Sequence, residues 1–470
     1  MTDNRQEVLS SSGLLGNERI GKLLFRFAVP MMLSLVLSAV YNMVDQIFIG
    51  QGVGYLGNGA TNVIFPLMQV ALAFGFMFGD GAASHMNLCM GEGKMDEARH
   101  SMAAGISASL AVGLLLSVLL PLFITPLCRV FGATDAILPY ALDYGLIICA
   151  FTVFGLFDVV TMSLIRADGS PGFAMLGLVA GCVTNLIGDP LAIFVLNMGV
   201  RGAAWATVLG QMVNAALNIW YLWGHTQSVH LDRAAFRGCF RFMGKISRLG
   251  FSSFIGQIGF VIVLFTQNNL LVHYGALSKY GAEIPMAALG VTMKFFAVLF
   301  CAVIGVAAGA QPIFSYNYGS RNYGRVMETL RLVLFIAVGV LGFATVWFQL
   351  APESVTALFG SGNALYDEYS VKCLRIFLAL IVLDAFELTG SIFFQAIGKP
   401  LIATVLILFR QIVIQLPFMV LFAWLFGVEG LLYSGPLDSF LVGTMAIFFL
   451  WRERKKMRQE PCRSQAILQD

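Results

Sequence analysis

Two carboxylates in otherwise apolar stretches are the residues of this sequence best suited to chemistry. Asp45 lies near the end of an apolar run that begins after Arg26, and Asp189 lies in NLIGDPLAIF at 185–194. An acid inside a membrane span costs roughly a few kcal/mol or more to keep charged, and it therefore marks a functional site. Asn185 precedes Asp189 by one helical turn, so the two side chains share a helix face. These residues predict a site that binds and releases a proton or a cation.

Two prolines accompany the two acids. Pro190 follows Asp189 and frees a backbone carbonyl one turn earlier, which offers a proton or cation another oxygen. Pro30 lies in the same apolar run as Asp45, and a proline removes one helix hydrogen bond and permits a bend. The alternative for both acids is a permanently neutral, hydrogen-bonded carboxyl that only fixes helix packing. We predict the functional role for Asp45 and Asp189, with Pro30 as the point where the helix bends.

Other acids inside apolar stretches are candidate secondary sites: Asp158, Asp384 and Glu387. Asp158 and Glu387 occupy equivalent positions of the two halves described below. Each acid can be a gate or a packing contact, and the sequence leaves both interpretations open. The same two interpretations apply to Asp80, which lies between two glycines.

A candidate substrate cavity is indicated by polar residues inside apolar stretches and by one methionine: Asn42, Gln267, Asn268 and Met293. Polar groups that face a wet cavity need no protein partner, whereas polar groups that face lipid are costly. Hydrogen bonds between helices explain the polar cluster at 266–269 equally well. Methionine is flexible and suits an adaptable pocket.

The composition is that of a polytopic membrane protein. The chain has 470 residues, of which 58% are hydrophobic and 12% charged, against about 25% charged in soluble domains. Nucleic-acid binding has no support, because no basic face is interleaved with aromatic residues. The 8 cysteines are scattered without CxxC or metal-ligand spacing, so we expect no disulfide framework, no structural metal site and no cofactor.

Apolar stretches of spanning length predict twelve transmembrane helices. They are expected at 23–50, 59–89, 99–127, 138–165, 171–196, 200–223, 247–274, 285–316, 326–351, 368–395, 400–426 and 428–451. The fold class is therefore an all-α membrane protein.

The two halves of the chain repeat each other. Gly81 and Gly91 match Gly309 and Gly319 at one offset, and the turns ADGSP and AIGKP match at nearly the same offset. Duplication of six spans in parallel orientation is a transporter architecture. We expect two six-helix lobes around a central cavity, with the substrate path between the lobes.

The polar connections set the expected boundaries and the orientation. We predict an N-lobe at 1–223, a linker at 224–246, a C-lobe at 247–451 and a basic tail at 452–470. Lys and Arg concentrate in the linker and the tail, and cytoplasmic loops carry such an excess. The sequence therefore predicts a multi-pass protein of the cell membrane with both termini in the cytoplasm, and a monomer.

Four motifs together resemble the MATE (multidrug and toxic compound extrusion) family of transporters. They are YNMVDQIFIG with Asp45, GEGKMDEA at 91–98, the turn ADGSP, and NLIGDPLAIF at 185–194. The resemblance spans about residues 20–450. It implies two lobes around a central cavity, alternating access, and export of organic cations driven by H⁺ or Na⁺.

The resemblance also assigns residues. It implies an N-lobe cation or proton site with the following members: Asp45, Asn185, Asp189, Tyr144 and Thr207. Pro30 matches the family's bending proline. The chain departs from the family at Gln257, which stands near the place where some members carry a Glu, so Gln257 is assigned to the substrate cavity instead.

The sequence thus predicts a secondary active exporter of amphipathic, often cationic, organic molecules, coupled to H⁺ or Na⁺. A lipid or lipid-linked sugar flippase of the same broad superfamily is the alternative, although such a protein would have a more basic cavity. An embedded transferase is excluded, because the loops are short and carry no catalytic cluster. The expected partners are small organic substrates and the lipid bilayer.

Overall fold

The computed structural model describes residues 15–16, 18–53, 55–131, 133, 135–281, 283–356 and 364–467. The first half comprises α2 (Ile20–Val53), α3 (Tyr55–Gly91), α4 (Met95–Leu122), α5 (Ile124–Val130), α6 (Leu138–Ala150), α7 (Thr152–Ala167), α8 (Pro171–Pro190), the π-helix η1 (Leu191–Val195) and α9 (Val200–Gly224). The second half comprises α10 (Phe240–Ala276), α11 (Glu283–Gly319), α12 (Tyr323–Leu350), α13 (Pro352–Thr356), α14 (Ala364–Lys372), η3 (Cys373–Phe377), η4 (Ile381–Leu383), α15 (Asp384–Ala396), α16 (Pro400–Leu408), η5 (Phe409–Gln415), α17 (Leu416–Phe426), η6 (Gly427–Glu429) and α18 (Gly430–Ile467).

Each of the twelve predicted segments corresponds to one helix or to consecutive helical pieces. By length and hydropathy, 9 helical segments of the described residues can cross a membrane, or 10 if the bent pair α6 and α7 counts as one span. One of these segments, Pro400–Gln459, joins two predicted spans, and α9 is not among them. The twelve predicted segments are obtained when the bent pair counts as one span, α9 is added and Pro400–Gln459 is divided into its two predicted spans. The predicted linker is shorter than expected, because α10 already begins at Phe240.

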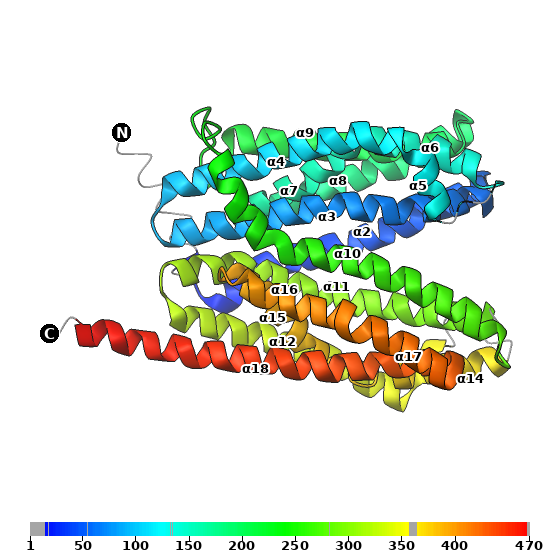
Figure 1. Ribbon diagram of the computed structural model, residues 1–470. Coiled ribbons are helices and arrows are strands. Elements are labelled where there is room, and N and C mark those ends of the chain that lie inside the picture. The colour runs from blue at the N-terminus through cyan, green and yellow to red at the C-terminus, as the bar shows by residue number, and fades with distance from the viewer. Residues whose placement is uncertain are drawn as a thin grey trace.

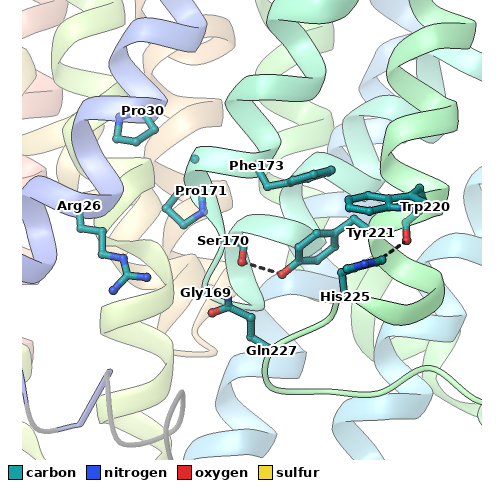
Figure 2. Close-up of a pocket in the computed structure, with 11 residues that line it drawn as sticks. Arg26, Pro30, Gly169, Ser170, Pro171, Phe173, Trp220, Tyr221, His225 and Gln227 are labelled. Atoms are coloured by element: carbon teal, nitrogen blue, oxygen red, sulfur yellow. Dashed lines mark hydrogen bonds between the residues drawn. The ribbon is translucent and has the colours of Figure 1, made fainter. Parts of the chain in front are cut away.

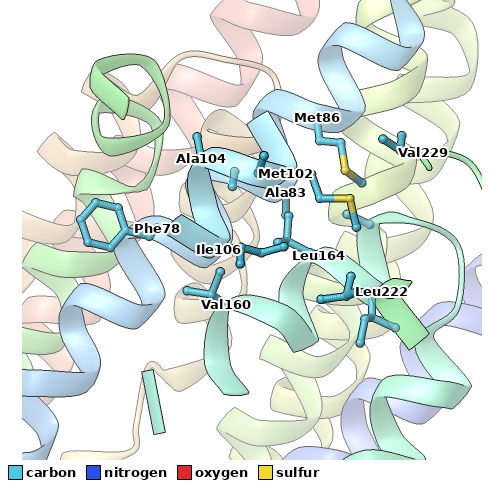
Figure 3. Close-up of a cluster of buried hydrophobic side chains, with 14 of the residues drawn as sticks. Phe78, Ala83, Met86, Met102, Ala104, Ile106, Val160, Leu164, Leu222 and Val229 are labelled. Carbon is cyan, nitrogen blue, oxygen red and sulfur yellow. The ribbon is translucent and has the colours of Figure 1, made fainter. Parts of the chain in front are cut away.

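The helices form two bundles, one from α2–α9 (the N-lobe) and one from α10–α18 (the C-lobe) (Figure 1). The start of α2, the end of α18 and the connection between α9 and α10 lie at the same end of the molecule, which we call the terminal face (Figure 1). Near this face, the core of the N-lobe joins α3, α4, α7 and α9 through residues such as Met86, Met102, Leu164 and Leu222 (Figure 3). Val229 of the connecting segment packs into the same core.

Asp168, in the turn between α7 and α8, holds the connecting segment against the N-lobe. Its carboxylate accepts hydrogen bonds from the backbone N–H groups of Gln227, Ser228 and Val229 at 2.7, 2.8 and 3.1 Å and from the Tyr221 hydroxyl at 2.8 Å. Burial raises the pKa of Asp168 to about 6, and these donors lower it in part. The sequence showed this residue only as part of a repeated turn.

The two lobes contact each other near the terminal face. The Gln311 amide of α11 donates to Ser84 Oγ of α3 at 2.8 Å, and Ser253 Oγ of α10 donates to Asp80 Oδ2 of α3 at 2.8 Å. Asp80 therefore contributes to the contact between the lobes. The first half of α2 also packs into the core of the C-lobe, through residues such as Leu24 and Phe27.

Two repeat-related glycines meet in this contact. A Cβ on Gly91 would lie 3.0 Å from Gly319 Cα, and a Cβ on Gly319 would lie 3.2 Å from Gly91 Cα. Equivalent positions of the two halves thus touch each other across the interface. We call this contact between the lobes the terminal seam; it includes Gly91, Gly319, Asp80 and Ser84.

Candidate functional site

Four helices of the N-lobe bring the predicted site residues together. α2 carries Asp45, α6 carries Tyr144, α8 carries Asn185 and Asp189, and α9 carries Thr207. Asp45 and Asp189 are only 8% and 1% exposed. Because an unpaired buried charge is costly, each of these carboxyl groups must be either neutral or paired with another group.

Thr207 organises the polar contacts of this site. The hydroxyls of Tyr144 and Tyr41 lie near the Thr207 hydroxyl. The Asn185 side-chain oxygen accepts from the Thr207 hydroxyl at 3.2 Å and from the Thr207 backbone N–H at 3.0 Å. The Asn185 amide nitrogen then faces Asp189 and donates to its Oδ2 at 2.8 Å.

The carboxyl groups of Asp45 and Asp189 lie close enough to interact directly. Two adjacent ionised carboxylates repel each other, whereas a proton on one carboxyl allows it to donate a hydrogen bond to the other. Asp45 Oδ1 is buried, and no described residue donates a hydrogen bond to it. The pair is therefore suited to share a proton, and Asp45 Oδ1 is an oxygen that can accept a proton or contact a cation.

The backbone beside Asp189 is irregular. α8 ends at Pro190 and continues as the π-helix η1 over Leu191–Val195. A proline cannot donate the usual hydrogen bond, and π-helical turns occur frequently at functional sites. The irregular backbone follows directly on the acid that shares the proton.

α2 runs through Pro30 without interruption in this structure. The Ser34 hydroxyl donates to the Pro30 carbonyl at 2.7 Å. Because Pro30 donates no helix hydrogen bond, α2 is weakest here. The role of Pro30 as a bending point stays a prediction.

The residues predicted to line the substrate cavity differ in their surroundings. Asn42 and Asn268 are exposed and Gln257 is half-buried, whereas Gln267 is buried in α10. Met293 packs against the core of the C-lobe. The Asn42 amide donates to the Ser38 carbonyl at 2.7 Å, so it is already partnered within α2.

The candidate secondary acids fall into two separate groups. Asp158 is buried in the N-lobe near Asn214, whose amide donates to Met162 Sδ at 3.7 Å. Asp384 and Glu387 belong to a buried cluster of the C-lobe around Arg410. The Arg410 guanidinium binds Glu387, and its other nitrogens lie 3.7 Å from Asp384 and 3.4 Å from Asp438.

The sequence interpretation missed Tyr41, Asp438 and the part that Arg410 plays. Tyr41 precedes Asp45 by one helical turn, which places it on the same helix face. Asp438 lies inside a predicted span, and an acid there is itself a signal of function. Both signals were therefore present in the sequence.

A cavity of about 600 Å³ lies beside the turn at 169–172, away from the acid pair (Figure 2). Phe173, Trp220 and His225 stack along one side of it, with ring centroids 5.8 and 3.8 Å apart. Arg26 and Pro30 of α2 line the opposite side (Figure 2). Its lining includes none of the residues predicted to bind the coupling ion.

Comparison with known proteins gives consistent results. The MatE family model matches residues 30–191 and 258–421. The multidrug export protein MepA of Staphylococcus haemolyticus (strain JCSC1435) is 24% identical over 444 residues, which cover 93% of this chain and 95% of the relative.

Two solved structures share the fold. One is the outward-facing conformation of a multidrug resistance MATE family transporter of the MOP superfamily, with a TM-score of 0.87, 22% identity and coverage of 96% of this chain and 99% of the other. The second is a MOP superfamily transporter from Pyrococcus furiosus whose binding pocket of reverse polarity suggests a different function, with a TM-score of 0.86, 22% identity and the same coverage of 96% and 99%.

Proposed function

The chain belongs to the MATE family of multidrug efflux transporters, and on that premise we propose that it exports amphipathic, often cationic, organic compounds by antiport with a cation. The family consists of transporters and not of enzymes. The observation that carries the proposal is the pair of neighbouring acids, Asp45 and Asp189, buried in the N-lobe.

The acid pair supports H⁺ as the coupling ion. A proton shared by the two carboxyls would neutralise one of them, and its loss would leave two adjacent like charges in an apolar surrounding. The contact between α2 and α8 therefore depends on protonation. Asn185, itself bonded by Thr207, holds Asp189 in place, so that Asp45 and α2 are the parts free to respond.

Coupling requires that cation and substrate favour different conformations. We propose that the described structure is the state in which the terminal seam is closed, and that α2 bends at Pro30 in the cycle. Substrate enters the cavity between the lobes, which Asn42, Gln257, Gln267, Asn268 and Met293 line. The secondary acids Asp158, Asp384 and Glu387 stabilise the lobes rather than couple transport.

The coupling ion can be identified in reconstituted vesicles. The purified protein is placed in liposomes, ΔpH and ΔNa⁺ are imposed separately, and ethidium efflux is followed by fluorescence. We expect efflux against the ethidium gradient under ΔpH alone. Efflux under ΔNa⁺ alone would assign Na⁺ instead. Failure of both gradients would remove the antiport proposal.

We further propose that the terminal face lies in the cytoplasm of the cell and that the protein acts as a monomer. The basic residues of the connecting segment and of the end of α18 support this orientation.

The orientation predicts how engineered cysteines react. In a cysteine-free background, a cysteine in place of Arg233 or Arg237, both exposed, should react only with reagents that enter the cytoplasm. Labelling is measured in intact cells with a membrane-impermeant maleimide, and permeabilised cells serve as the control. Labelling from outside in intact cells would reverse the orientation.

A further inference from the structure

Three potential metal ligands meet near the terminal face, away from the acid pair. His85 and Cys89 lie one turn apart on α3, and Glu97 lies in the first turn of α4. One ligand atom from each of the three lies within 4.8 Å of the other two. The sequence interpretation expected no metal site, because only the antiparallel packing of α3 and α4 brings Glu97 to the other two residues.

Ser101 fixes the histidine in a form that can bind a metal. The Ser101 hydroxyl donates its proton to the Glu97 carbonyl at 2.7 Å. Its oxygen, 2.6 Å from His85 Nδ1, must therefore accept the proton of that nitrogen. The unprotonated Nε2 then presents its lone pair. Cys89 Sγ lies 4.0 Å from Nε2 and 3.6 Å from Nδ1, so the imidazole must turn for Nε2 and Sγ to share a metal ion. A hydrogen bond from the other ring nitrogen is the usual support of a metal-binding histidine.

We propose that His85, Cys89 and Glu97 bind Zn²⁺ or a similar divalent transition-metal ion. Imidazole nitrogen, thiolate sulfur and carboxylate oxygen are the three ligand types that zinc takes, at about 2.0–2.3 Å from the ion. Tetrahedral bonds of that length place ligand atoms roughly 3.3–3.7 Å apart. Small rotations of the three side chains would bring their ligand atoms, now within 4.8 Å of one another, to these shorter separations. Water fills the fourth position.

Lys245 of α10 competes with the metal. Its ammonium lies 3.3 Å from Glu97 Oε2, and both side chains are substantially exposed. A bound metal must displace this ion pair, which is weak because water surrounds it. The ion reaches the site through a cavity of about 550 Å³ that His85, Lys245 and Arg248 line.

The site is complete within the N-lobe. All three ligands come from α3 and α4, so the metal should bind whether or not the lobes move. Cys89 lies two positions before Gly91, which touches the C-lobe in the terminal seam. The proposal does not depend on antiport, and it can be tested without any gradient.

The test is cobalt binding to the purified full-length protein in detergent. Co²⁺ bound by a thiolate gives a sulfur-to-metal charge-transfer band in the near ultraviolet, and four-coordinate Co²⁺ gives visible d–d bands. We expect both bands at one equivalent of Co²⁺, and their loss when Zn²⁺ is added. Cys89→Ser should abolish the charge-transfer band, and His85→Gln and Glu97→Gln should each weaken Co²⁺ binding at least 10-fold.

Matched variants serve as controls. Cys182→Ser and His225→Gln change a cysteine and a histidine outside the cluster, and both should leave the bands unchanged. Lys245→Met removes the competing ammonium and should tighten Co²⁺ binding. Absence of the bands from the unmodified protein, or their persistence in Cys89→Ser, would overturn the proposal. Glu97→Gln changes a partly exposed residue, so it tests the site even if the buried Cys89 variant does not fold.

Discussion

Asp45→Asn and Asp189→Asn are each expected to reduce gradient-driven efflux to the rate of passive leak, while substrate binding stays measurable. Asparagine keeps the size and hydrogen bonding of the acid, but it cannot exchange a proton. In either variant the asparagine amide can donate a hydrogen bond to the remaining acid in every state, because its N–H groups are not lost by titration. The contact between α2 and α8 no longer responds to the cation, so the two fluxes are no longer coupled.

Efflux and binding are measured separately, by ethidium transport in vesicles and by equilibrium titration of the detergent-solubilised protein. Asp143→Asn is the matched control, because Asp143 is a half-exposed acid on α6 that pairs with Arg201, at 2.6 Å. A surface pair of this kind contributes about 0–1 kcal/mol, so transport should be unchanged. Gln257→Ala should weaken substrate binding by no more than about 10-fold, or ~1.4 kcal/mol.

Two results would contradict the assignment of coupling to the N-lobe. One is that both asparagine variants still concentrate ethidium against its gradient. The other is that Glu387→Gln alone uncouples transport, since Glu387 lies in the C-lobe and binds Arg410. That result would move the coupling to the acids around Arg410.

The candidate site could be predicted from the sequence to a large extent, because its residues obey local rules. An acid in a span, an amide one turn away and a proline beside it are visible without a structure. The packing of α2, α6, α8 and α9 places Asp45, Asn185, Asp189, Tyr144 and Thr207 together. The chain of hydrogen bonds from Thr207 through Asn185 to Asp189 needed the structure, because Thr207 lies on a different helix from the other two.

Contacts between distant segments could not be predicted in the same way. Asp168 holds the connecting segment through backbone N–H groups, and any residues there could supply such groups. Its repeat equivalent in the C-lobe is Ile397, whose side chain cannot accept a hydrogen bond, so the duplication gave no hint. Arg410 and Asp438 lie on different helical pieces, and only tertiary packing shows that they belong to one cluster with Glu387.

The terminal seam is another contact that local patterns do not reveal, although the glycines that form it are part of the repeat. At Gly250 of α10 the two lobes touch through backbone atoms: a Cβ there would lie 1.7 Å from the Met77 carbonyl oxygen of α3. No rotation of a side chain relieves that clash, because both partners are backbone. Any residue larger than glycine must therefore move α10 away from α3.

Gly250→Ala is accordingly expected to favour the conformation in which the terminal seam is open. Overpacking costs about 1–3 kcal/mol. If this cost falls only on the state with the seam closed, it shifts the equilibrium between the states by roughly 5- to 150-fold. Transport should slow, because the cycle must pass through the disfavoured state.

The shift can be measured as a distance between spin labels on opposite sides of the terminal seam. Asp96 on α4 and Glu328 on α12 are exposed and lie in different lobes, so cysteines placed there in a cysteine-free background report its opening. Gly250→Ala should increase the population at the longer distance. Gly244→Ala is the matched control, because a Cβ on Gly244 of the same helix meets nothing within 4 Å. If both variants give the distance distribution of the parent protein, the contact at Gly250 does not open during transport, and rocking of the two lobes about this seam is not the mechanism.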